Sequence, residues 1–94
     1  MSTALPKIVR VKPLGGHRLE IAFADGAEGA HDLSWIFETP GPMNEPLRDP
    51  AYFARVFLEV GALVWPNGYD LSPWNIRKRM KDGGELRTAA VAAE

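Results

Sequence analysis

The segment that decides the fold is Arg18–Gly26, RLEIAFADG. Apolar and polar residues alternate along it with a period of two, which is typical of a strand with one buried face and places Leu19, Ile21 and Phe23 on that face. An Asp-Gly pair follows at once and favours a tight hairpin turn, because glycine adopts a positive φ at little cost. The segment therefore predicts an antiparallel pair whose second strand is residues 27–32.

The flanking sequence extends this pair into a larger antiparallel system. Residues 8–12 also alternate, and turn residues separate them from Arg18, which predicts a three-stranded meander. Residues 56–60 and 62–65 predict a second hairpin around Gly61. We therefore expect an α+β fold in which a small antiparallel sheet of four to six strands is combined with two or three short helices.

Two of these helices have clear start signals. Asp49-Pro50 and Ser72-Pro73 each place a capping side chain before a proline at the first helical position. The second helix ends at Gly83-Gly84. Bulky residues over 33–37 predict one further helical turn before the Pro-Gly-Pro loop.

Composition predicts one globular domain over residues 1–94. Of the 94 residues, 46% are hydrophobic and 24% are charged, which is ordinary for a folded domain. We expect the core to span about residues 5–82 and the Ala-rich tail 85–94 to be flexible. The chain has no cysteine, begins without a secretory signal pattern and contains no apolar run near the length of a membrane span, so a cytoplasmic location is predicted.

Candidate catalytic and ligand motifs are weak. His31 and Asp32 are adjacent, but neighbours in a strand point to opposite faces, so His31 is predicted to be an exposed or packing side chain. His17 is expected at a loop tip. Two histidines without cysteine do not supply a zinc site, and the glycines lack phosphate-loop spacing. We expect no catalytic residue, no metal, no cofactor and no enzyme activity.

The segment 65–74 admits two interpretations. In the first, which we favour, Pro66-Asn67-Gly68 forms a structural corner and Trp65 fills core volume. In the second, aromatic residues around the turn form an exposed patch of the kind enriched at protein interfaces. The candidate interaction residues are then Trp65, Asn67, Tyr69 and Trp74.

The last predicted helix is basic, although the net charge of the chain is −1. Its cations are candidates for contact with nucleic acid phosphates. The alternative is that cations near a helix C-terminus complement the helix dipole and keep the surface hydrated. The residues concerned are Arg77, Lys78, Arg79 and Lys81.

Several of these motifs together resemble the bacterial domain-of-unknown-function family 2442. The similar segments, spread over about residues 5–73, are Pro6–Val11 with Leu19, Phe23–Gly26, Glu45–Pro50 with Phe53, and Val64–Gly68 with Asp70-Leu71. The resemblance implies a small antiparallel α+β domain, in some cases fused to a helix-turn-helix domain. The segment after Asp70 is shorter than we expect for such a domain, and the basic run Arg77–Arg79 is not part of the shared motif.

The resemblance assigns no catalytic residue. It implies one half of a two-gene, toxin–antitoxin-like or regulatory pair whose other half is a small protein. We therefore expect a protein-interaction or regulatory domain without catalysis, with another small protein or a second copy of the chain as partner and no membrane association. The alternatives are a nucleic-acid-binding regulator that uses the basic helix and, third, a small enzyme or ligand binder.

Overall fold

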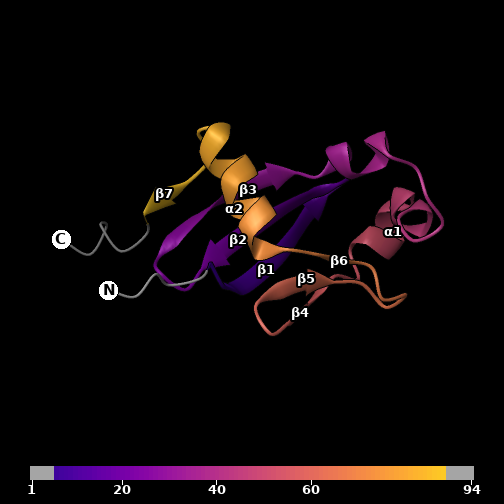
Figure 1. The fold of residues 1–94 in the computed structure, drawn as a ribbon, viewed down its shortest axis with the longest axis horizontal. Coiled ribbons are helices and arrows are strands. Elements are labelled where there is room, and N and C mark those ends of the chain that lie inside the picture. The colour runs from indigo at the N-terminus through magenta and orange to yellow at the C-terminus, as the bar shows by residue number, and fades with distance from the viewer. Residues whose placement is uncertain (1–5, 89–94) are drawn as a thin grey trace.

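The computed structural model describes residues 6–88 (Figure 1). Its larger sheet is a meander of β1 (Ile8–Gly15), β2 (Arg18–Phe23) and β3 (Ala27–Asp32), with the short strand β7 (Arg87–Thr88) added beside β3. All neighbouring strands in it are antiparallel. The predicted meander is therefore confirmed.

The Asp25-Gly26 turn joins β2 to β3 as predicted. Gly26 has a φ of 96°, and its N–H donates to the carbonyl oxygen of Phe23 at 3.0 Å. The Asp25 carboxylate accepts from the N–H of Ala27 at 3.1 Å. Local side-chain and backbone bonds thus close the turn that the sequence indicates.

The second hairpin forms a separate three-stranded sheet. It consists of β4 (Phe57–Glu59), β5 (Ala62–Val64) and the two-residue strand β6 (Asp70–Leu71). The α+β class is confirmed; the two-residue strands β6 and β7 are additions that no local pattern predicted. Two 3₁₀ helices, η1 (Ser34–Glu38) and η2 (Glu45–Arg48), and the short helix α1 (Pro50–Phe53) connect the two sheets.

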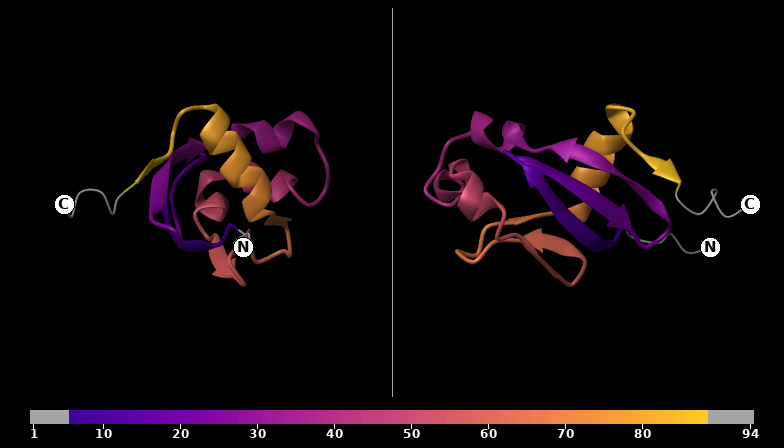
Figure 2. Two further views of the ribbon diagram at one scale, coloured as in Figure 1. Left: turned by 60° about the vertical axis from the view of Figure 1, so that its left-hand side comes forward. Right: turned by 180° about the vertical axis from the view of Figure 1, so that it is seen from behind.

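Helix α2 (Pro73–Asp82) lies across one face of the meander, and the view from behind shows the sheet in front of it (Figure 2). The Ser72 hydroxyl accepts from the N–H of Trp74, so the predicted cap is present. Gly84, with a φ of 70°, ends the helix in a Schellman turn. In this turn the N–H of Glu85 donates to the carbonyl of Met80 and that of Gly84 to the carbonyl of Lys81.

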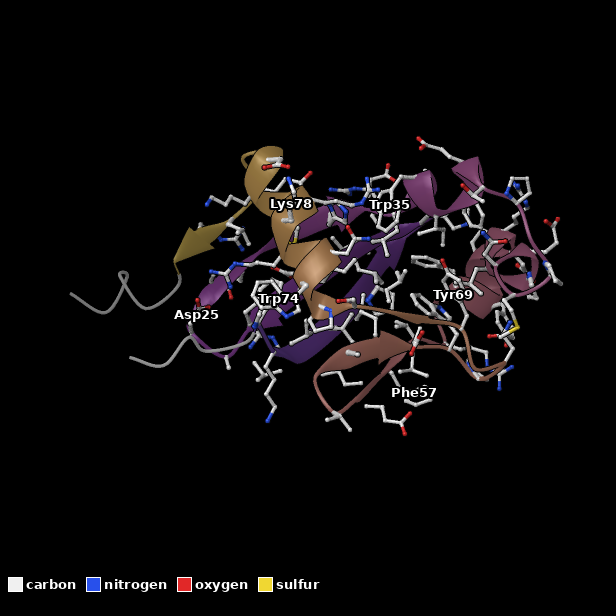
Figure 3. All side chains as sticks on the ribbon, in the orientation of Figure 1. Asp25, Trp35, Phe57, Tyr69, Trp74 and Lys78 are labelled. Carbon is white, nitrogen blue, oxygen red and sulfur yellow. The ribbon has the colours of Figure 1, made fainter. Side chains whose placement is uncertain are left out.

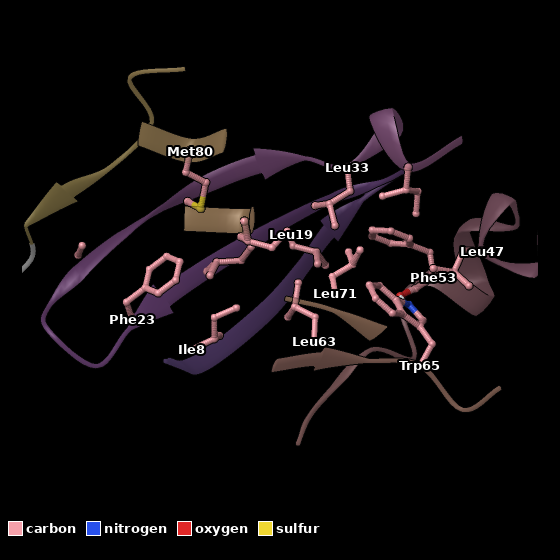
Figure 4. Packing of buried hydrophobic residues seen from close by; sticks show 14 residues of the cluster. Ile8, Leu19, Phe23, Leu33, Leu47, Phe53, Leu63, Trp65, Leu71 and Met80 are labelled. Carbon is pink, nitrogen blue, oxygen red and sulfur yellow. Dashed lines mark hydrogen bonds between the residues drawn. The ribbon is translucent and has the colours of Figure 1, made fainter. Parts of the chain in front are cut away.

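The core lies between the meander, α2 and the second sheet (Figure 4). Leu19 and Ile21 on β2 are fully buried, as the alternation predicts. From α2, Ile76 and Met80 enter this core at i, i+4 spacing, while Leu63 comes from β5. Each element therefore contributes one apolar face to a continuous interior.

The structure describes residues 85–88, the first four of the tail 85–94 that the sequence predicts to be flexible. Glu85 follows the Schellman turn, and residues 87–88 pair with Ala27 and Glu28 of β3. The segment 85–88 is thus attached to the sheet by a contact that its Ala-rich context does not indicate. The remainder of the predicted tail, residues 89–94, lies outside the described residues.

A close approach at Gly29 of β3 makes this attachment sensitive to substitution. A Cβ at Gly29 would collide with the backbone carbonyl of Glu85, and the Met80 side chain lies next to it. We expect Gly29→Ala to lower the free energy of unfolding by at least about 1 kcal/mol, because a backbone atom cannot move aside as a flexible side chain can. Urea denaturation measures this.

Gly41→Ala is the matched control for Gly29→Ala. A Cβ at Gly41 meets only the Asn44 side chain, at 3.9 Å, so its effect should stay within about 0.5 kcal/mol. Equal stability of the two variants would show that the approach of Glu85 to β3 does not constrain the fold.

Candidate functional site

The surface of α2 carries a shallow groove with a volume of about 550 Å³. We call it the α2 groove, and it combines two apolar side chains with three cations. Residues 74, 77, 78 and 81 fall on one side of the helix because their spacing follows its turns, whereas Ile76 and Met80 face the core. The lining residues are Trp74, Arg77, Lys78, Lys81 and Leu86.

Trp74 is the main apolar feature of the α2 groove, and 54% of its surface is exposed. It is fixed in the first turn of α2 by the Ser72 cap. Leu86 reaches the groove from the other end of the helix, after the Schellman turn. The indole and this leucine thus form an apolar wall that two separate segments of the chain supply.

Arg77 is held by an acidic partner from the meander. Its Nη1 and Nη2 atoms donate to the two Asp25 carboxylate oxygens at 3.2 and 2.9 Å, and its guanidinium lies 4.8 Å from the centre of the Phe23 ring. This bidentate bond, with a further bond from the N–H of Ala27, holds the pKa of Asp25 below its usual value of 3.8. Arg77 is therefore a fixed wall of the groove.

The two lysines of the groove differ. Lys78 donates to Asp82 at 2.8 Å within the exposed face of the helix, and this bond lowers the pKa of the Asp82 carboxyl. Lys81 forms no ion pair within residues 6–88, although its charge contributes more weakly to the same lowering at Asp82. Lys81 is thus the cation of the groove that residues 6–88 leave available.

Arg79 points away from the other three predicted nucleic-acid contacts. Its guanidinium lies over the Trp35 ring, 3.6 Å from the ring centre, beside a smaller cavity of about 350 Å³ that Tyr69 also lines. A cation stacked in this way on an indole is stabilised by the ring electrons. The four basic residues therefore occupy two sides of α2.

The alternative interpretation, an exposed aromatic cluster around the 65–69 turn, is contradicted at Trp65. Trp65 is fully buried and donates its Nε1–H to the carbonyl of Phe53 at 2.9 Å, so it cannot contact a partner. Asn67 is half-buried and donates to the carbonyl of Met43 at 2.8 Å. Figure 3 shows Tyr69 well apart from Trp74. The favoured interpretation, a structural corner with Trp65 in the core, is confirmed, and of the four candidates Trp74 is the exposed one.

His31 is a packing histidine and part of the support for the groove. It is 5% exposed and accepts at Nε2 from the Trp35 Nε1–H at 3.0 Å. Its Nδ1–H therefore donates to the Glu85 carboxylate, at 2.7 Å. Asp32 instead bonds to Ser34, so the two neighbours do not form a catalytic pair. The His31 bond fixes Glu85 immediately before Leu86.

His17 lies in the turn between β1 and β2, as expected, but its ring is half-buried and bonded to another part of the chain. Its Nε2 lies 3.0 Å from the carbonyl oxygen of Leu47 and 3.1 Å from that of Arg48, so this nitrogen donates to both. The ring packs edge-on against Phe37 and Phe53. His17 thus ties the turn between β1 and β2 to η2 and α1.

Within residues 6–88, no group of three or more His, Cys, Asp or Glu side chains lies close enough to hold a metal ion. No helix among the same residues has the length and apolar character of a membrane span.

The Arg77–Asp25 bond generates a pH-dependent prediction. Replacing Arg77 by Gln should raise the pKa of Asp25 toward 3.8, and carboxyl chemical shifts followed by NMR measure this. Because the folded-state pKa of Asp25 is lowered, the bond stabilises the fold above about pH 3.8 and this contribution disappears as the pH falls through that pKa.

The stability difference between the wild type and Arg77→Gln should therefore shrink in acid. Asp82 serves as the internal control, since its partner is Lys78 and its pKa should not change. An Asp25 pKa that is the same in both proteins would contradict the bond.

Comparison with known proteins gives one match. Residues 8–82 match the model of a family described as "Protein of unknown function (DUF2442)". The matched segment runs from the first residue of β1 to the last residue of α2, so Leu86 and β7 follow it. No curated protein and no solved structure matches the chain.

Proposed function

The chain belongs to the DUF2442 family of proteins of unknown function, and we propose that it is a non-catalytic module that binds another protein through the α2 groove. The single observation that carries the proposal is that α2 presents an exposed indole beside an arginine that an ion pair fixes. Trp74 is more than half exposed, while Arg77 beside it is fixed by Asp25. Exposed tryptophan next to a positioned arginine is typical of residues that dominate protein interfaces.

The arrangement of charges on α2 supports contact with nucleic acid less well than contact with a protein. Arg77 and Lys78 are paired with Asp25 and Asp82, and Arg79 is stacked on Trp35 on another side. A phosphate chain needs several available cations in one stripe, and each contact contributes to affinity. Asp25 and Asp82 reduce the net positive charge that such a chain would meet on this side of α2.

The absence of catalysis is part of the proposal. The Nε2 atoms of both histidines have structural partners, His17 with two backbone carbonyls and His31 with the Trp35 indole. A general base needs a nitrogen that can reach a substrate proton. Neither imidazole therefore has the arrangement that proton transfer at its Nε2 requires.

The family resemblance is the basis for proposing what kind of protein the partner is. We propose that the partner is a small protein encoded beside this chain, as in a two-gene, toxin–antitoxin-like or regulatory pair. A groove of this size accommodates a few side chains, which fits a short segment of such a partner.

A partner captured from the native host should depend on Trp74. We expect Trp74→Ala to lose the captured protein, because the indole is the largest exposed contact in the groove. Phe57→Ala is the matched control, since this aromatic residue of β4 is 43% exposed and lies outside the groove (Figure 3). Mass spectrometry identifies the protein, and sedimentation shows whether it is a second copy of the chain. Capture that Trp74→Ala leaves unchanged would refute the groove as the binding surface.

Binding to a generic DNA duplex should be absent even at low salt. Fluorescence anisotropy at about 50 and 200 mM salt measures this, with Arg77, Lys78, Arg79 and Lys81 replaced by Gln as the comparison. Tight binding that weakens steeply with salt and disappears in the Gln variant would favour the nucleic-acid regulator instead.

A further inference from the structure

We infer that the α2 groove takes an acidic segment of the partner, with a carboxylate on Lys81 and a neighbouring apolar side chain against Trp74 and Leu86. The inference rests on the proposed function and names the chemistry of the partner. It is argued from the apolar wall of the groove and from the distribution of its charges.

The charges of the groove identify the polar part of the ligand. Arg77 is engaged bidentately by Asp25, whereas Lys81 has no ion-pair partner within residues 6–88. The Lys78–Asp82 pair is exposed on both sides, with 74% and 62% of the two side chains accessible. Exposed pairs of this kind contribute little to stability, but Lys78 already has a carboxylate partner. Within residues 6–88 the groove thus offers one cation without an ion-pair partner, Lys81.

This small number of cations favours a carboxylate over a phosphate chain. Asp25 and Asp82 lie beside the same cations and keep the local field mixed. A nucleic acid brings closely spaced charges that all require neutralisation, whereas a peptide brings one or two carboxylates among neutral groups. Charge complementarity therefore points to an acidic peptide segment.

The apolar wall identifies the second part of the ligand. Trp74 and Leu86 line the groove together, and Leu86 is half-buried against the core. Leu86 is held from behind, because Glu85 before it bonds to both Met80 and His31. A large apolar side chain that enters beside this leucine buries area against a wall that is already positioned, which lowers the cost of ordering.

Selection of peptides on the full-length protein tests the inference. Phage carrying random peptides are selected on the immobilised wild type and counter-selected on Lys81→Glu. We expect enriched sequences in which an Asp or Glu lies close to a large apolar residue. A synthetic peptide of such a sequence should lose at least about tenfold in affinity when its acidic residue is replaced by the corresponding amide. The unchanged peptide should also bind at least about tenfold more weakly to Lys81→Glu than to the wild type.

The controls are a second Lys81 variant, a test of folding and a competing oligonucleotide. Lys81→Gln removes the charge without reversing it and should weaken the peptide less than Lys81→Glu; circular dichroism confirms that both variants are folded. Enriched peptides without an acidic residue, or peptides that Lys81→Glu binds equally well, would overturn the inference. Displacement of the peptide by oligo-thymidine as the tighter ligand would also overturn it and assign the groove to single-stranded nucleic acid.

Failure of this inference can be distinguished from failure of the proposed function. If the captured host protein depends on Trp74 but no acidic peptide is selected, the partner uses the groove with other chemistry and only this inference fails. If neither the captured protein nor the selected peptides depend on groove residues, the proposed function fails as well.

Discussion

The segment after α2 passes so close to the larger sheet that the carbonyl group of Glu85 occupies the place where a Cβ of residue 29 on β3 would lie. Only glycine leaves room for it, since any Cβ at this position would occupy the same space. The Schellman turn around Gly84 brings the chain down to that contact, and the bond between Glu85 and His31 secures it. Leu86 and β7 follow immediately, so the groove and the fourth strand of the sheet both depend on this approach.

Much of the fold could be predicted because its signals are local. The alternation over Arg18–Phe23, the Asp25-Gly26 turn and the caps at Asp49 and Ser72 each act within a few residues of the chain. Hairpins join strands that are neighbours in sequence, so no long-range pairing had to be inferred to obtain the meander. The same reasoning explains why β6 and β7 were not predicted, since two-residue strands carry no periodicity.

The candidate site was predicted less well because its positions depend on distant partners. Trp65 was expected in the core, but the sequence does not show that the carbonyl of Phe53 accepts from its indole or that Trp74 lies on a helix surface. The partners of His17 are two carbonyls of η2, about thirty residues away, which no local pattern indicates. Leu86 follows a double glycine that ends a helix, where sequence patterns stop being informative.

The acidic residues around α2 reduce the number of its cations that are available to a ligand. Counted along the sequence, four cations in five positions suggest a surface for phosphates, but three of them are engaged by Asp25, Asp82 and Trp35. The Asp25 partner comes from a turn far away in the sequence, and the tight turn that exposes its carboxylate is also what closes the meander. A residue of the turn that builds the meander therefore pairs with one of the four cations of α2, Arg77. On this side of α2 the exposed Trp74 indole lies in one groove with Lys81, a cation without an ion-pair partner within residues 6–88, and we therefore expect a partner that brings an apolar side chain and a single carboxylate.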